Sequence, residues 1–129
     1  MILTFRTDKP EAEIGLFDGR KRIQYTTWQA HRELAETIHD RIHTLLKAAG
    51  KDWPDLTGVV VFKGPGSFTG LRIGITVANA LSYSYKIPIV GRVDESWVQV
   101  GLTMLENGKD DHMITPEYGA DANISLPRK

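Results

Sequence analysis

The sequence predicts an α/β domain whose elements follow the order β-β-β-α-β-α-β. Three observations lead to this prediction. Short apolar or alternating runs open the chain, apolar residues then recur at helical spacing in two long stretches, and a short apolar run follows each stretch. Strands joined through helices are normally parallel, whereas strands joined by tight turns are antiparallel. The sequence therefore indicates a mixed sheet with helices packed on it.

The first three strands are expected to form an antiparallel meander. Apolar runs cover 2–5 and 13–17, and the second run is followed by Asp18 and Gly19, a pair that favours a hairpin turn. In the third run, 21–27, apolar and polar residues alternate, as on a strand with one buried face.

Two helices are predicted at 31–49 and 67–85. The first is amphipathic, and Gly50 stands where glycine commonly ends a helix. Between the helices, 57–62 is rich in β-branched residues and is typical of a central strand covered on both faces. The second helix leads into a further strand at 87–90.

Beyond Gly91 the pattern weakens, and Asp94 is a candidate cap for a short helix that carries Trp97 and Leu102.

Composition excludes several classes of function. The 129 residues include no Cys, which rules out disulfides, thiolate zinc sites, a Cys nucleophile and iron–sulfur clusters. The 16 basic and 16 acidic residues balance, so the chain lacks the positive field of a self-sufficient nucleic-acid binder. No apolar run reaches membrane-spanning length and no signal peptide is evident. We expect a cytoplasmic domain without membrane contact.

The most informative stretch is the loop that opens the second helix. It contains Gly64, Pro65, Gly66, Ser67 and Thr69. Such a loop is able to bind an anion at the helix N-terminus. This one lacks the Gly-Lys-Ser/Thr ending of a P-loop, Pro65 removes a donor, and Thr69 replaces the third glycine of G-x-G-x-x-G. We interpret it as a tight turn capped by Ser67, with a phosphate cradle as the alternative.

The second helix is apolar nearly all round. Small residues recur every four positions along one stripe, at Gly70, Gly74, Ala78 and Ser82. A second face carries Ile73, Val77, Ala80 and Leu81, and a third carries Phe68, Leu71 and Ile75. Each helical glycine costs about 1 kcal/mol relative to alanine, so close approach by another backbone is expected. The sheet covers one side and the first helix another. A partner chain would cover the rest, with the C-terminal segment as the alternative.

We therefore predict a partner interface on the two helices, although some of its candidate residues must face the sheet instead. The candidates are Leu34, Ile38, Ile42, Leu45, Phe68, Gly70, Leu71, Gly74, Ile75 and Ala78. On this view Gly74→Leu blocks association and leaves the fold largely intact.

Other motifs carry weaker signals. His39 and His43 lie one helical turn apart, as in a zinc-binding H-E-x-x-H helix, but no third ligand is evident, and we reject a metal site. The basic turn 20–22 is interpreted as solvated, with contact to tRNA phosphates as the alternative. Trp28, Trp53 and Trp97 are widely spaced and are expected at the edges of the core.

The run Gly64–Gly74 resembles the signature of the bacterial TsaB (YeaZ) family, the catalytically silent partners in making threonylcarbamoyladenosine on tRNA. Ala78, Ala80, Leu81 and the run 87–91 continue the match, which covers about residues 1–95. The resemblance implies an actin-like (ribonuclease-H-like) fold with no catalysis, cofactor or metal of its own. It also implies a scaffold that pairs through its first two helices with TsaD or a second copy, with the ATPase TsaE joining and tRNA reached through the complex.

Two features depart from that family. Its members open with an Ile-x-x-Asp-Thr-Ser-like strand from which the actin-like phosphate loop derives, and here Arg6 stands in place of the Asp, which argues against nucleotide hydrolysis. The chain also has room for one subdomain, 1–93. Residues 94–129 are then a short helix and the remnant of a reduced or absent second subdomain, with 114–118 resembling the family's Pro-x-Tyr ending.

Three functions follow from these observations. The leading hypothesis is a non-enzymatic scaffold subunit that dimerises with TsaD. The alternative is an actin-like ATP-dependent transferase or peptidase-type enzyme whose glycine loop binds phosphate, which predicts nucleotide affinity in the isolated chain. A third is a homodimeric interaction module that has drifted from tRNA modification.

Overall fold

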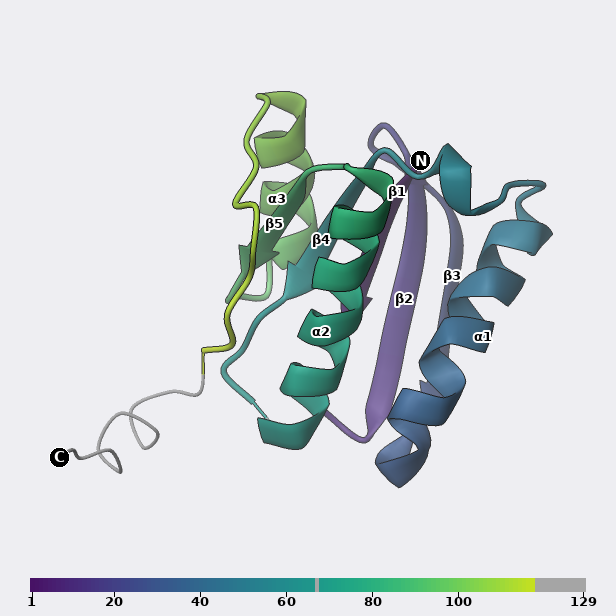
Figure 1. Cartoon of the computed structure of the whole chain (residues 1–129), viewed down its shortest axis with the longest axis vertical. Helices are drawn as coiled ribbons and strands as arrows, with labels where there is room; N and C mark the ends of the chain where they lie inside the picture. Colours follow the sequence, from purple (N-terminus) through teal and green to yellow (C-terminus); the bar gives the residue numbers. More distant parts are fainter. Residues whose placement is uncertain (67, 118–129) are drawn as a thin grey trace, which may run out of the picture.

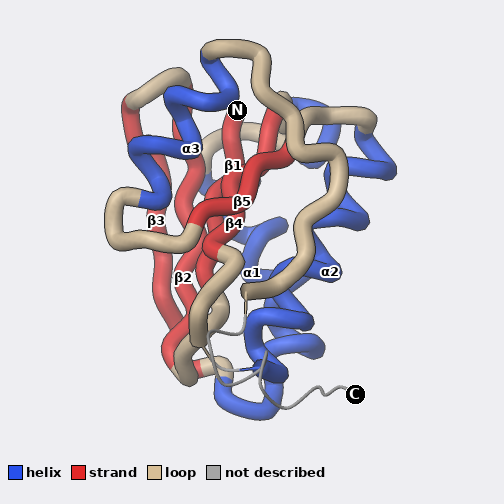
Figure 2. Tube along the Cα trace, turned by 90° about the vertical axis from the view of Figure 1, so that its left-hand side faces the viewer, coloured by secondary structure: helices blue, strands red, loops and turns tan. Residues whose placement is uncertain are grey.

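In the computed structural model, which describes residues 1–66 and 68–117, a five-stranded sheet carries two helices on one face and one on the other (Figures 1 and 2). The elements in chain order are β1 (Ile2–Arg6), β2 (Glu11–Asp18), β3 (Lys21–Gln29), the 3-10 turn η1 (His31–Glu33), α1 (Leu34–Ala48), the 3-10 turn η2 (Trp53–Asp55), β4 (Gly58–Phe62), α2 (Phe68–Tyr85), β5 (Ile89–Arg92) and α3 (Trp97–Glu106). The predicted α/β class and element order are confirmed.

The strand order is β3-β2-β1-β4-β5. β1, β2 and β3 pair antiparallel through tight turns, and β1, β4 and β5 pair parallel through helical crossovers, as predicted. β4 lies between β1 and β5, and all five of its residues are buried, which explains its β-branched composition.

Most of the core lies between the sheet and the helices α1 and α2. Leu3 and Phe5 of β1 are fully buried on this face, and the apolar stripe of α1 packs over β2 and β3. On the opposite face α3 packs mainly on β4 and β5, where Gly101 lies so close to Val60 that a β-carbon would collide with it. Figure 2 shows the sheet between these unequal layers.

One of the three predicted helix-end residues acts as expected. Gly50 adopts a left-handed φ of 71° just after α1, and its N–H bonds back to the carbonyl of Lys47, as expected of a glycine that ends a helix. Asp94 does not cap α3, because its carboxylate accepts a hydrogen bond from Ser96 Oγ instead. The predicted cap Ser67 lies outside the described residues.

Residues 110–117, here called the strap, close the free edge of β5. The N–H groups of Ile89 and Gly91 donate to the carboxylates of Asp110 (3.1 Å) and Asp111 (3.1 Å), and the Asp111 N–H donates to the Ile89 carbonyl (2.8 Å). Asn79 of α2 exchanges two hydrogen bonds with the backbone of Ile114. The strap thus satisfies edge groups that otherwise invite pairing with another chain, and it covers part of α2.

Asp110 gives the strap a pH dependence. Burial would raise the pKa of Asp110, but the N–H groups of Ile89 and His112 bond its carboxylate and hold the pKa below its ordinary value. A depressed folded pKa contributes stability above the unfolded value of about 3.9, and that stability is lost as pH falls further.

We therefore expect Asp110→Asn to unfold at a lower temperature than the parent at neutral pH. The difference should shrink as pH falls below about 4. Thermal unfolding across a pH series measures this, with Asp40→Asn on the exposed side of α1 as the control. A difference that does not change with pH would contradict the assignment.

Candidate protein interface

α2 is fixed to the end of β1 by one buried residue, Thr7. Its side chain is almost fully buried, and its Oγ1 donates to the carbonyl of Gly70 at 2.8 Å. A β-carbon at Gly74 would collide with the same Thr7 side chain. The close approach that the two helical glycines require is therefore supplied within the chain. The expectation that a partner backbone supplies it is wrong at Gly74, and so is the expectation that Gly74→Leu spares the fold.

Most of the predicted interface residues lie in the chain's own core. Gly74 is buried against Thr7, and Gly70 is half-buried beside it. Residues of both helices with at most 4% of their surface exposed are Leu34, Ile38, Ile42, Leu45, Leu71, Ile75 and Ala78. They face the sheet and are not available to a partner while the chain is folded. The side chain of Phe68 lies outside the described part of the structure.

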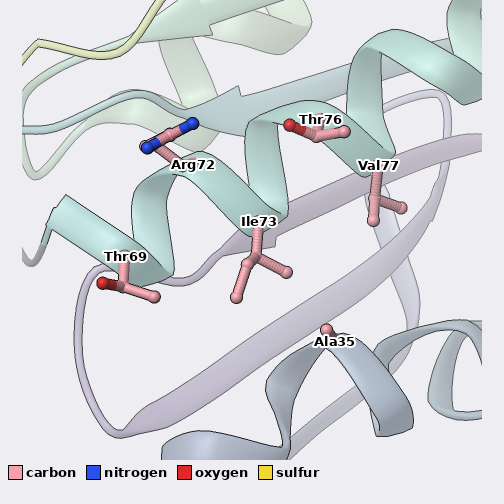
Figure 3. Close-up of a pocket in the computed structure, with 6 residues that line it drawn as sticks. All are labelled: Ala35, Thr69, Arg72, Ile73, Thr76 and Val77. Atoms are coloured by element: carbon pink, nitrogen blue, oxygen red, sulfur yellow. The ribbon is translucent and has the colours of Figure 1, made fainter.

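One open surface of these helices is a groove between them. It has a volume of about 380 Å³ and is lined by Ala35 of α1 and by Thr69, Arg72, Ile73, Thr76 and Val77 of α2. Figure 3 shows Ile73 and Val77 pointing from α2 toward Ala35. We call these six residues the docking groove. None of the six was among the predicted interface residues. Helical spacing grouped Ile73, Val77 and Ala80 with Leu81, which is buried, so periodicity did not separate this open side from the core.

The glycine loop packs against its own chain. A β-carbon on Gly66 would collide with the Asp8 side chain. Gly64, at a φ of 121°, leaves no room for a β-carbon beside the Glu117 carbonyl. An anion beside this loop would therefore face a carboxylate and a carbonyl oxygen. These contacts favour the interpretation as a tight turn over the phosphate cradle.

A buried ion pair lies beside that loop, where β1 ends. The Arg6 guanidinium binds Asp8 through two hydrogen bonds, from Nε to Oδ1 at 2.7 Å and from the second terminal nitrogen to Oδ2 at 3.2 Å. Glu95 lies 3.5 Å from the other terminal nitrogen, and the guanidinium carbon lies 3.9 Å from the Phe62 ring centroid. Burial alone would lower the pKa of Arg6, but the bonds and charge of Asp8 outweigh it and raise that pKa.

The weaker motifs are accounted for by contacts within the chain. His39 and His43 stack on Trp53, with ring centroids 4.7 and 6.1 Å away. Arg20 of the basic turn contacts Thr103 and Glu106 of α3, which ties the hairpin to that helix.

Trp28 and Trp97 are buried and Trp53 is half-buried, as expected of residues at core edges. Within residues 1–66 and 68–117 no helix is both long and apolar enough to cross a membrane.

Comparison with known proteins identifies the family. The family model described as "TsaD: tRNA N6-adenosine threonylcarbamoyltransferase" matches residues 28–93. The tRNA threonylcarbamoyladenosine biosynthesis protein TsaB of Bacillus subtilis is 41% identical over 80 residues, covering 61% of this chain and 32% of the relative. TsaB of Escherichia coli is 34% identical over 111 residues, covering 75% and 48%. The solved structure of YeaZ from Pseudomonas aeruginosa superposes with a TM-score of 0.68 at 22% identity, covering 83% and 49%.

These matches define an α/β protein of the actin-like, ribonuclease-H-like fold, as the resemblance implied. The chain belongs to the TsaD-like protein family, as a member of its TsaB (YeaZ) group. It spans between about a third and a half of the length of the TsaB relatives described above.

Gly74→Ala tests the contact between α2 and Thr7. At an open helical site this change would stabilise the protein by about 1 kcal/mol, because alanine is the better helix former. Here we expect it to destabilise by about 2 kcal/mol, because the added methyl overpacks against Thr7. Urea unfolding measures the sign, and Gly74→Ala should cost less in a Thr7→Ala background, where the colliding hydroxyl and methyl groups are absent, than in the parent. A stabilised single variant would contradict the contact.

Ile75→Ala and Ile73→Ala form a matched pair two residues apart on α2. Ile75 is buried, and its truncation should cost about 3 kcal/mol of unfolding free energy. Ile73 is half-buried in the docking groove, so its truncation should cost less than about 1 kcal/mol. Equal losses in urea unfolding would show that the division into core and open faces is wrong.

Proposed function

We propose that this chain is a non-catalytic scaffold subunit of the machinery that makes N6-threonylcarbamoyladenosine on tRNA. It acts in the cytoplasm and docks onto TsaD through the open sides of α1 and α2. TsaE joins the larger complex, tRNA is reached through that complex, and a second copy occupies the same surface when TsaD is absent. Membership of the TsaB group supports the pathway.

The observation that carries the docking proposal is the docking groove. Ile73 and Val77 keep part of their surface open, whereas Leu71, Ile75 and Ala78 of the same helix are buried in the core. Their neighbours Thr69 and Thr76 are exposed, so the groove has an apolar floor and polar margins. This combination is typical of a surface that a partner protein covers.

The contacts at the end of β1 support a scaffold role over an enzymatic one. Arg6 places a cation where the resemblance expects an aspartate, and that cation is already bound to Asp8. The loop from Gly64 to Gly66 is filled by Asp8 and by the Glu117 backbone. Neither feature favours a phosphate-binding enzyme.

Val77→Asp tests this function directly. A charge in the docking groove must be desolvated when the partner covers it, so we expect affinity for TsaD to fall at least about tenfold while the chain stays folded. Val93→Asp is the matched control, because Val93 is exposed after β5 and lies outside the groove. Size exclusion with light scattering, on each variant mixed with TsaD from the same organism, measures the complex.

A one-to-one complex with the parent and the control, lost in Val77→Asp, supports the proposal. If Val77→Asp forms the complex as well as the parent does, the proposal that TsaD binds at the docking groove is wrong. Absence of any complex, together with binding of ATP by the chain alone, would favour the enzymatic alternative. A homodimer that TsaD does not disrupt would favour a drifted interaction module.

A further inference from the structure

The carboxyl ends of parallel strands are where open α/β sheets usually bind their ligands. In this chain that edge is formed by β1, β4 and β5. The last residue of β1 is Arg6, and its side chain is only 9% exposed. The usual ligand position of the fold therefore holds a buried cation that belongs to the protein.

The surroundings of Arg6 are those of a cation site. Asp8, with a side chain 6% exposed, binds the guanidinium with both oxygens, and Glu95 reaches back to it from the loop before α3. The Phe62 ring lies under the guanidinium, an arrangement that favours positive charge. Two carboxylates and an aromatic face thus converge on one positive group.

These residues do not fit the metal-bound nucleotide that actin-like folds are associated with. A divalent cation binds carboxylate oxygens that are free to coordinate it. Both oxygens of Asp8 are already bonded to Arg6, and a metal ion placed beside them would meet the guanidinium charge. Gly66 also lies directly against Asp8, which leaves no room on that side.

We propose that Arg6 is a built-in cation that replaces a bound metal ion in this lobe. It neutralises the buried Asp8, adds a weaker contact to Glu95, whose side chain is 89% exposed, and holds the turn after β1 in place. Thr7 lies between the two members of the ion pair and contacts α2, so the same cation fixes the position of that helix. The lobe is therefore ordered without metal or nucleotide. This inference does not depend on the proposed docking partner.

Removing the cation should convert the pair of carboxylates into a metal site. We expect Arg6→Ala to lower the unfolding temperature of the full chain by about 10 °C, because Asp8 is left buried and unpaired. Millimolar Mn²⁺ should recover about half of that loss, because Asp8 and Glu95 can then coordinate it. The parent should respond to neither Mn²⁺ nor EDTA, and Arg6→Ala with Asp8→Asn should not respond to Mn²⁺.

Arg6→Lys distinguishes the contribution of the positive charge from that of the guanidinium geometry. It keeps the cation and loses the two-point contact, so it should retain more stability than Arg6→Ala and stay insensitive to Mn²⁺. If Arg6→Ala is unfolded without metal, recovery of its circular dichroism spectrum in Mn²⁺ supports the proposal and failure to recover contradicts it. The proposal would also be overturned if Mn²⁺ raised the unfolding temperature of the parent, or if Arg6→Ala were folded and Mn²⁺ did not raise its unfolding temperature.

Discussion

The contact of Thr7 with Gly70 and Gly74 determines how this molecule is arranged. It brings the backbone of α2 down onto the end of β1, as close as a helix without β-carbons at the contact allows. With that face fixed, the helix turns Ile75 into the core and leaves Ile73 open beside α1. The docking groove is thus a consequence of the contact, because a rotated α2 would expose a different set of side chains.

The segment that contains Thr7 also connects the carboxyl end of the sheet to α2, which lines the docking groove. Arg6 and Asp8 form the buried ion pair at the carboxyl end of the sheet, and Thr7 lies between them in the chain. An ion pair that breaks would release Thr7, and with it the position of α2. Arg6 and Asp8 thus occupy the usual ligand position of the fold, and Thr7 between them holds α2, whose open side lines the docking groove.

The order of elements was predictable from sequence because short apolar runs, an alternating run and two long helical stretches are separated by turn residues such as Gly19 and Gly50. The candidate interface was not, because a helix that is apolar all round gives no moment to tell Leu71, which is buried, from Ile73. The spacing of Gly70 and Gly74 predicted a close approach, but sequence alone cannot name its partner. The pairing of Arg6 with Glu95 was equally hidden, because it joins residues far apart in the chain.

Amide hydrogen exchange of the chain, alone and mixed with TsaD from the same organism, tests the central claim most directly. If the open sides of α1 and α2 are the docking face, TsaD should slow exchange in segments around 35–39 and 69–77, which include the residues of the docking groove. The carboxyl end of the sheet around Arg6 should not change. Slowed exchange at that end, with none along α2, would contradict the account.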